Sequence, residues 1–284
     1  MTELPARAGD GDRDAAEALL RELGTRPGER LPLAEAAFAL SARRAPRPGL
    51  ARYREHLALL ADQVGEAARG AHGLAPRIAA LNAVLFQRHR YAGDTLTYED
   101  PQNADLIRVI DRRKGLPVAL GILAIHVARA QGWEMAGLAL PGHFLVRVEY
   151  AGERAILDPF NGGRTRDATE LRELLRAMAG IEDLAPQHYA PVSDRDVLLR
   201  LQNNLKLRYL ESQAPAEALG VLEGMLLIAP MAGRLWHEAA LLHAEFGNLG
   251  DAAHALEHAI ALATDADERR RAAHLLERCK LRLN

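Results

Sequence analysis

The pattern of apolar and polar positions along the chain centres on residues 117–130, a stretch that is apolar on nearly every face. Such a stretch indicates a helix that is enclosed by other elements. Proline is tolerated in the first turn of a helix, because its missing N–H would have no intrahelical partner there, and glycine commonly follows the last turn. We therefore predict a buried central helix that begins at Pro117 and stops before Gly132.

Short runs after this helix predict the strands of a small antiparallel sheet. These runs, each bounded by Gly or Pro, are residues 135–140, 143–150 and 153–160. Alternation in the middle run places Phe144 and His143 on opposite faces, and Ala151-Gly152 suits the turn of a hairpin. Pairing across that turn brings His143 within reach of Asp158. A histidine held by a carboxylate is the base-and-orienter half of a catalytic triad.

Amphipathic stretches on both sides of this region are typical of helices. They cover residues 31–44, 49–70, 75–91 and 167–180. Residues 1–30 are rich in Gly, Asp, Arg and Pro and predict a mobile N-terminal arm, with a few helical turns over 12–24 as the alternative. The linker 185–194 contains two prolines and indicates a domain boundary. The predicted division is an arm (1–30), a first domain (31–190) and a second domain (191–284).

The second domain repeats itself with a shift of 34 residues, the period of the tetratricopeptide repeat. The shift superimposes Arg200 on Arg234, Leu201 on Leu235, Leu207 on Leu241, Glu217 on Asp251, Ala218 on Ala252, Leu222 on Leu256 and Glu223 on Glu257. Two helix pairs, about 196–230 and 231–264, and a polar-faced closing helix are predicted. Arrays of this kind hold extended peptides or helices, so we expect a protein or peptide partner.

Composition narrows the class of protein further. The 284-residue chain is 49% apolar but only 5% aromatic, so its core must rest mainly on Ala, Leu, Val and Ile, which favours helices. Its 36 basic and 38 acidic residues are spread along the chain, so neither nucleic acid nor a membrane surface is an expected partner. No apolar run reaches about 18 residues, no signal-peptide pattern opens the chain, and one cysteine allows no disulfide framework. We expect a cytoplasmic protein.

These motifs resemble a known family. Four features resemble the transglutaminase-like core of the papain-like cysteine fold: Gly115, separated by one residue from the helix start, the Arg129-x-x-Gly132 helix end, the strand-borne His143 and the Asp158-Pro159 pair. The segments RRKGLPVAL, PGHFLVRV and DPFNGGR are similar to segments of bacterial SirB1-type proteins. In those proteins, tetratricopeptide repeats follow the transglutaminase-like core. The resemblance covers residue 31 to the end. It implies an α+β fold, mostly helical, with a small antiparallel sheet and a C-terminal α-helical repeat module.

The same resemblance draws attention to a missing nucleophile. Active members carry their cysteine twelve residues before the helix-end arginine, and counting back from Arg129 reaches Pro117, which has no nucleophilic atom. Ala119 stands where SirB1-type relatives often have a serine, and Cys279 lies close to the C-terminus. We expect His143 and Asp158 to form a candidate or vestigial dyad. The expected pocket residues around it are Gly115, Pro117, Ala119, Phe144 and Asn161.

Two other polar groups have simpler explanations. The spacing of Asp94, Asp100, Asn103 and Asp105 fits no EF-hand, and turn or N-cap roles are expected for them. The basic run 112–114 could bind an anionic group or form the favoured basic end of a helix over 106–113. His143 and Asp158 alone are too few ligands for a metal. We therefore expect neither a metal nor a cofactor.

Two functional hypotheses follow. In the first, the chain is a pseudoenzyme, a non-catalytic scaffold or regulator whose repeat module binds a protein or peptide. In the second, His143 oriented by Asp158 activates water and hydrolyses an amide or ester bond, with N–H groups at the start of the central helix stabilising the oxyanion. The absence of a thiol at Pro117 favours the first hypothesis.

Overall fold

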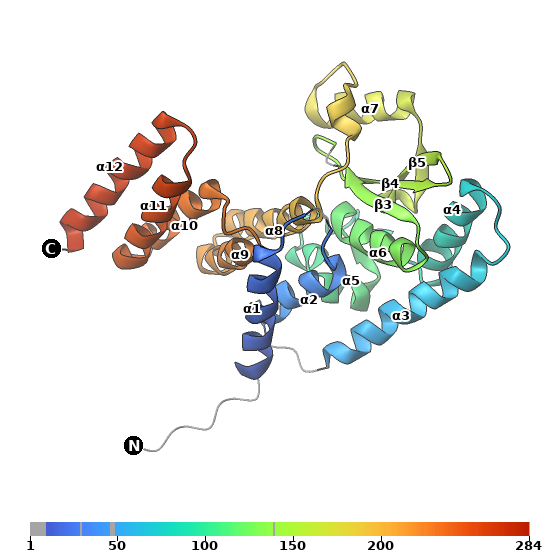
Figure 1. Ribbon diagram of the computed structural model, residues 1–284, viewed down its shortest axis with the longest axis horizontal. Helices are drawn as coiled ribbons and strands as arrows, with labels where there is room; N and C mark the ends of the chain where they lie inside the picture. The colour runs from blue at the N-terminus through green and yellow to red at the C-terminus, as the bar shows by residue number, and fades with distance from the viewer. Residues whose placement is uncertain (1–9, 29, 46–48, 139, 284) are drawn as a thin grey trace. The chain divides into compact units, whose positions relative to one another are not determined.

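The computed structural model describes residues 10–28, 30–45, 49–138 and 140–283, and helices dominate it (Figure 1). Its contacts group into two compact units. We call one the sheet unit, residues 27–41 and 47–201, and the other the repeat unit, the described residues of 1–26, 42–46 and 202–284. The predicted class, a mostly helical α+β chain with a small sheet followed by helical repeats, is confirmed.

The sheet unit begins with helices. These are α2 (Leu33–Arg44, whose last three residues group with the repeat unit), α3 (Leu50–Ala67), α4 (Leu74–Asn82), the π-helix η1 (Ala83–Arg88), the 3-10 helix η2 (Pro101–Ala104) and α5 (Leu106–Arg112). The single helix expected over 75–91 is therefore interrupted, because α4 widens into the π-helical turn. A two-residue parallel pair joins β1 (Ala92–Gly93) to β2 (Lys114–Gly115).

The central helix α6 spans Pro117–Ala130, and nearly all of its residues are buried. Its start at Pro117 and its stop before Gly132 confirm the prediction made from these two residues. The chain enters the helix from a fixed point, because the Leu116 N–H donates to the Asn103 carbonyl oxygen at 3.0 Å. α6 is thus an enclosed scaffold against which the other elements of the unit pack.

A four-stranded antiparallel sheet follows α6. Its strands are β3 (Glu134–Leu138), β4 (Leu145–Tyr150), β5 (Glu153–Asp158) and β6 (Arg164–Arg166), hydrogen-bonded in the order β3-β4-β5-β6. The predicted hairpin is present: Tyr150 pairs with Glu153, and Ala151 and Gly152 both have positive φ, the geometry of a type I′ turn. This turn matches the strand twist and fixes the register in which β4 and β5 meet.

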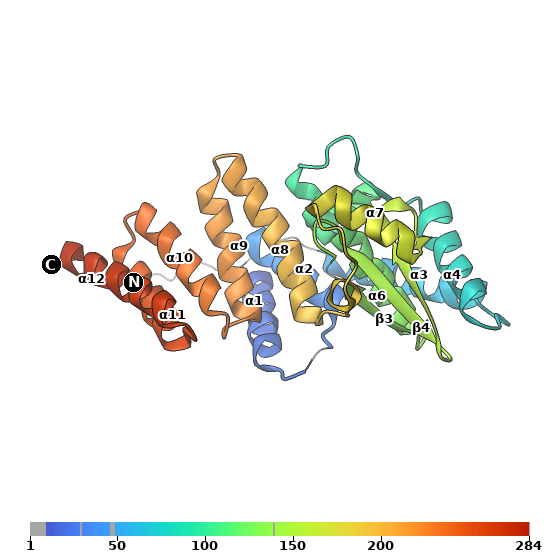
Figure 2. The ribbon, with the colours of Figure 1, turned by 90° about the horizontal axis from the view of Figure 1, so that it is seen from above.

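Helices cover both faces of this sheet. Figures 1 and 2 show α6 on one side of the strands and α7 (Ala168–Ala179) on the other. Phe144 packs toward α6, since a Cβ on Gly121 would lie 2.5 Å from its ring. Leu145 points the opposite way and packs with Leu171 and Leu175 of α7. Alternation therefore sends Phe144 and Leu145 to opposite sides of the sheet. The 3-10 helix η4 (Pro186–Tyr189) continues the chain beyond α7.

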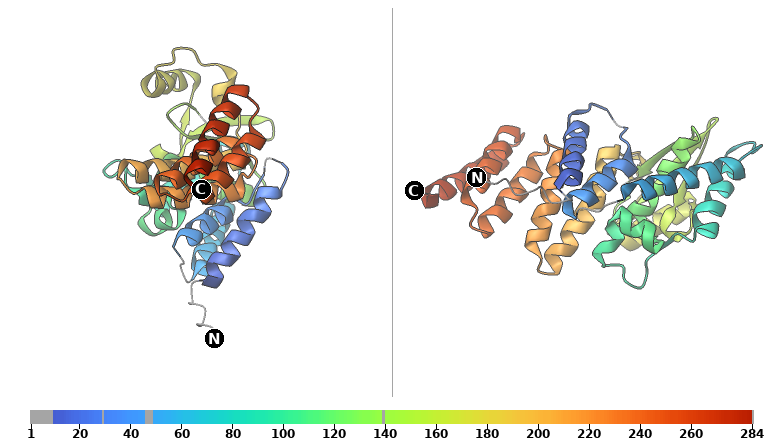
Figure 3. Two further views of the ribbon diagram at one scale, coloured as in Figure 1. Left: turned by 90° about the vertical axis from the view of Figure 1, so that its left-hand side faces the viewer. Right: turned by 90° about the horizontal axis from the view of Figure 1, so that it is seen from below.

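The repeat unit is a run of helices in chain order. They are α8 (Asp194–Glu211, whose first turns group with the sheet unit), α9 (Pro215–Ile228), α10 (Gly233–Glu245), α11 (Leu249–Leu262) and α12 (Ala266–Leu283). Each of α9 to α12 packs on the next, and they lie side by side (Figure 3). Small buried residues, among them Ala218, Ala239, Ala252 and Ala272, allow this close approach.

The N-terminal segment differs from the expected mobile arm. Residues Asp10–Thr25 form helix α1, which packs on α9, and Leu20 and Leu23 are fully buried there. Local composition favoured an arm. Burial of two leucines on one helical face, however, contributes more free energy than the ordering of the polar residues around them costs. Residues 1–9 of the expected arm lie outside the described part of the chain.

Among the described helices, none combines the length and the apolar content that crossing a bilayer would require.

Candidate functional site

His143 is positioned by the turn that leads into β4. Gly142 has φ of 77°, and a Cβ there would lie 2.5 Å from Met178, so this turn favours glycine for its conformation and for the space it needs. The His143 N–H donates to the Leu140 carbonyl oxygen at 3.1 Å, which fixes the backbone. The imidazole is buried, with 7% of the residue exposed. The ring therefore has one defined environment.

Asp158 ends β5 and meets this ring. Its Oδ1 lies 3.1 Å from Nε2 of His143, so the pair expected from the hairpin register is hydrogen-bonded. An ionised carboxylate only accepts hydrogen bonds, so Nε2 must carry the proton. In the neutral ring Nδ1 is then the basic nitrogen. The geometry assigns a single tautomer to His143.

The carboxylate of Asp158 has every side occupied. Asn161 donates its backbone N–H to Oδ1 at 3.3 Å and its side-chain Nδ2 to Oδ2 at 2.8 Å. Arg166 donates two further bonds to Oδ2, from Nε at 3.1 Å and from Nη2 at 2.7 Å. Asp158 is 0% exposed. One buried carboxylate thus ties together the start of β4, the η3 turn (Pro159–Asn161) and β6.

These donors decide the charge of Asp158. Burial alone raises the pKa of a carboxyl, but the hydrogen bonds from His143, Asn161 and Arg166 outweigh it and hold the pKa of Asp158 well below its usual range. The group is a carboxylate throughout the physiological range. It orients the imidazole and has no proton to give.

An aromatic ring closes the edge of the site. Phe160, in the η3 turn, meets the His143 ring edge-on at 6.4 Å between centroids, and Tyr98 meets Phe160 in the same manner at 5.8 Å. A Cβ on Gly93 would lie 2.5 Å from the Phe160 ring, so β1 packs directly on it. Gly93 pairs with Gly115 across the parallel bridge, which brings the segment before α6 to this edge.

The start of α6 completes the site. Pro117 lies one helical turn before Gly121, on the same helical face, and Gly121 packs on Phe144, the residue after His143. Ala119 is fully buried within the first turn. Of the expected pocket residues, Asn161 contacts the dyad directly, whereas Gly115, Pro117 and Phe144 belong to the segments packed around it.

The other polar groups have structural roles. Asp105 caps α5 by accepting from the N–H groups of Ile107 and Arg108, and Asp100 caps η2. Arg112 donates to Asp94 at 2.8 Å and to Asn103 at 2.9 Å, which leaves it bound inside the loop. Thr97 and Arg112 outweigh the effect of burial and lower the pKa of Asp94 to about 2. Nowhere among the described residues do three His, Cys, Asp or Glu side chains converge as metal ligands would.

The single cysteine belongs to the other unit. Cys279 lies on α12 of the repeat unit, where it is 7% exposed. Among the residues that the structure describes, the hydrogen-bond and ring partners Asn161, Arg166 and Phe160 of His143 and Asp158 belong to the sheet unit.

Sequence comparison places this site in a family. Residues 51–203, more than half of the chain, match the model described as the transglutaminase-like superfamily. The chain belongs to the transglutaminase-like superfamily. Within that superfamily its match runs from α3 into α8 and includes the dyad and α6. Residues 205–277 match the tetratricopeptide repeat, which accounts for α9 to α11 and most of α12.

Several bacterial proteins are similar to long stretches of this chain. A UPF0162 protein of Xylella fastidiosa (strain Temecula1) is 34% identical over 192 residues, 66% of this chain and 68% of the relative. UPF0162 protein PA3419 of Pseudomonas aeruginosa is 32% identical over 174 residues, 60% of this chain and 63% of its own. Protein SirB1 of Salmonella typhimurium is 26% identical over 127 residues, 44% of this chain and 47% of its own. Their matches to this chain therefore leave about a third to a half of each relative uncovered. The resemblance to SirB1-type proteins is confirmed.

Two partners of the dyad, Arg166 and Phe160, were not predicted from the sequence. Arg166 follows a glycine-containing turn after Asp158, and a tight turn there returns the chain antiparallel to β5, with Asp158 opposite Arg164. This register could have predicted the contact, because it places Arg166, two residues after Arg164, beside the carboxylate of Asp158. Phe160 gave no signal, because its approach to His143 depends on the η3 turn.

Proposed function

We propose that the chain is a non-catalytic scaffold, which binds a protein or peptide through its repeat unit and keeps its transglutaminase-like site as a structural element. The observation that carries the proposal is Pro117 at the start of α6. Thiol catalysis in this superfamily requires a nucleophile at that point, and a proline ring supplies neither a nucleophilic atom nor an N–H.

The saturated state of Asp158 supports the proposal. Five hydrogen bonds reach its two oxygens, and they link three consecutive pieces of chain. A network of this completeness stabilises the fold whether or not the histidine moves a proton. Retention of the dyad is therefore accounted for without catalysis.

The repeat unit supplies the binding surface. Stacked helical repeats commonly recognise peptides or helices of other proteins. Leu207 and Leu241 occupy equivalent positions in the two repeats, one period apart, and remain 45% and 44% exposed. A large apolar side chain that is left at the surface in both repeats favours a protein partner there.

Affinity capture with variants tests this proposal. The tagged full chain is used to capture partners from cells of the source organism after cross-linking, beside Leu207→Glu, Leu241→Glu and His143→Gln. The scaffold role predicts one recurring partner whose capture falls at least about fivefold with either leucine variant and stays within about twofold for His143→Gln. Leu96→Glu is the matched control, because Leu96 is 85% exposed but lies in the sheet unit. Loss of capture with His143→Gln but not with the leucine variants would contradict the proposal.

A second candidate function is hydrolysis of an amide or ester by water that His143 activates. The specific observation in its favour is the intact tautomer, with Nδ1 as the basic nitrogen and Asp158 held ionised behind the ring. N–H groups of the first turn of α6, from Val118 onward, would stabilise the oxyanion. This candidate predicts turnover that His143→Ala abolishes while Leu207→Glu leaves it intact.

A further inference from the structure

A cavity of about 360 Å³ opens in the repeat unit between α10, the end of α11 and the start of α12. Its polar lining includes Arg234 and His237 from α10 and Glu268 and Arg271 from α12. Its apolar lining includes Leu262 and Met231. Its volume suits one or two side chains, so the cavity would admit part of a peptide chain.

The guanidinium groups of this cavity lack close carboxylate partners. Arg234 is 83% exposed and reaches Glu238 only at 3.8 Å, beyond hydrogen-bond distance. Glu238 is instead paired with the buried Lys206 of α8. No ion pair or hydrogen bond of the Arg271 side chain is recorded within the described part of the chain. By contrast its neighbour Arg270 is paired with Asp267. Two arginines against one glutamate leave the cavity with an excess of positive charge.

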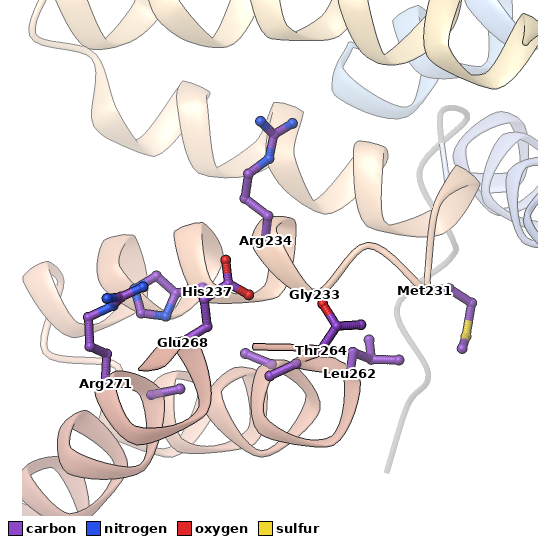
Figure 4. Close-up of a pocket in the computed structure, with 11 residues that line it drawn as sticks. Met231, Gly233, Arg234, His237, Leu262, Thr264, Glu268 and Arg271 are labelled. Atoms are coloured by element: carbon purple, nitrogen blue, oxygen red, sulfur yellow. The ribbon is translucent and has the colours of Figure 1, made fainter. Parts of the chain in front are cut away.

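The cavity has a polar end and an apolar end (Figure 4). His237, Glu268 and Arg271 gather at the first, whereas Leu262 and Met231 lie at the second. The Arg234 side chain extends from α10 away from both groups. Met231 is 76% exposed, an unusual state for a large apolar side chain. A ligand that complements both ends needs an acidic group and an apolar group close together.

We propose that this cavity binds an acidic segment of a partner protein, with one carboxylate at Arg271, a second at Arg234, and a neighbouring apolar side chain at Leu262 and Met231. The inference rests on the proposed scaffold function and states the chemistry of its partner. Guanidinium groups pair with carboxylates through charge-assisted hydrogen bonds.

A peptide suits the cavity better than a nucleic acid. Phosphate backbones are recognised by extended tracks of Lys and Arg, whereas this cavity holds a glutamate, and the chain as a whole carries a formal charge of −2. Glu268 can instead accept a hydrogen bond from a peptide N–H. The mixed lining therefore indicates a carboxylate in a polypeptide.

Selection from a library of random short peptides displayed on phage, with the purified full chain as bait, tests the inference. We expect enrichment of sequences with Asp or Glu beside Leu, Ile, Met or Phe. A fluorescent peptide of that consensus should bind the Arg234→Ala/Arg271→Ala double variant at least about tenfold more weakly than the wild type, and binding should weaken as salt rises from about 50 to about 300 mM. Arg270→Ala is the matched control and should stay within about twofold.

A charge-reversal variant distinguishes loss of binding from loss of folding. Arg271→Glu should reject the acidic consensus and accept a version in which Lys replaces its acidic residues, with the thermal unfolding temperature close to that of the wild type. Enrichment of peptides without acidic residues, or equal binding by the double variant, would overturn the inference while leaving partner capture, and so the scaffold proposal, intact. Arginine-dependent binding of a random oligonucleotide, but of no peptide, would also overturn it.

Discussion

The carboxylate of Asp158 and the guanidinium of Arg271 are opposite cases of a charged group in one molecule. Asp158 is fully buried in the sheet unit and accepts five hydrogen bonds. Arg271 lines an open cavity of the repeat unit, and no partner is recorded for it among the described residues. A charge whose bonds are all satisfied inside the chain stabilises the fold, whereas a charge left open is available to another molecule. Under the proposed function, the first charge serves the fold and the second is open to a partner.

Removal of Asp158 should have the largest effect. Asp158→Ala leaves the Nε2–H of His143 buried without its acceptor and reduces the carboxylate partners of Arg166 to Glu170 at 3.6 Å. Loss of one partner of a buried network costs about 3 kcal/mol of unfolding free energy. Urea denaturation followed by a signal from the sheet unit measures this loss. Glu182→Ala is the control, because Glu182 pairs with Arg176 at the surface and should cost less than about 0.5 kcal/mol. A loss under about 1 kcal/mol for Asp158→Ala would mean that the dyad is not a structural element.

A cysteine introduced at position 117 should show whether His143 faces the start of α6. In a Cys279→Ser background, Pro117→Cys restores sulfur at the start of α6, and an imidazole in reach would stabilise its thiolate. We expect iodoacetamide to alkylate this cysteine about 10 to 100 times faster at pH 6 than the same cysteine with His143→Ala added. Both variants carry the cysteine at the same helix start, so the ratio of their alkylation rates reports the effect of His143 alone. Equal rates would show that His143 does not face residue 117.

The pH dependence of stability should show a smaller effect from a different histidine. Burial, aided by the positive charge of Arg113 and the neighbouring His89, lowers the pKa of His56 to about 4. The unfolded histidine takes up a proton near pH 6.5, while the folded one resists until about pH 4. The contribution of His56 to the free energy of unfolding is therefore fully present above pH 6.5 and is lost as the pH falls toward 4.

Solvent screening of the half-exposed ring reduces this contribution to about 1 kcal/mol. Denaturation at a series of pH values should show the decline in the wild type, and His56→Gln should flatten it between pH 6.5 and about 4. Asp158 and Asp94, whose pKa values are lowered, act in a separate window: their contribution is present above about pH 4 and is lost below it. The same decline in His56→Gln would assign it to other groups.

Local signals predicted most of the fold. Pro117 and Gly132 bounded α6, and Ala151-Gly152 located the hairpin, because a proline, a glycine or a two-residue turn acts through its own backbone. The repeat period located the second unit, since a repeated pattern reports its own packing.

Long-range packing supplied the rest. α1 forms because Leu20 and Leu23 find α9 some two hundred residues later in the sequence, which local composition does not encode. Within the site, the pairing of His143 with Asp158 followed from strand register, but the approach of Phe160 to His143 depended on the η3 turn. The repeat-unit cavity gave no sequence signal, since its lining comes from the ends of three helices.

Under the proposed function, the transglutaminase-like site of this chain holds the fold and performs no hydrolysis. The most direct test measures the cleavage of broad fluorogenic ester and peptide libraries by the purified wild type and by His143→Ala, with circular dichroism to verify that both are folded. The account predicts that both proteins release fluorophore at the uncatalysed rate. Multiple turnover by the wild type that disappears in a folded His143→Ala variant would contradict it.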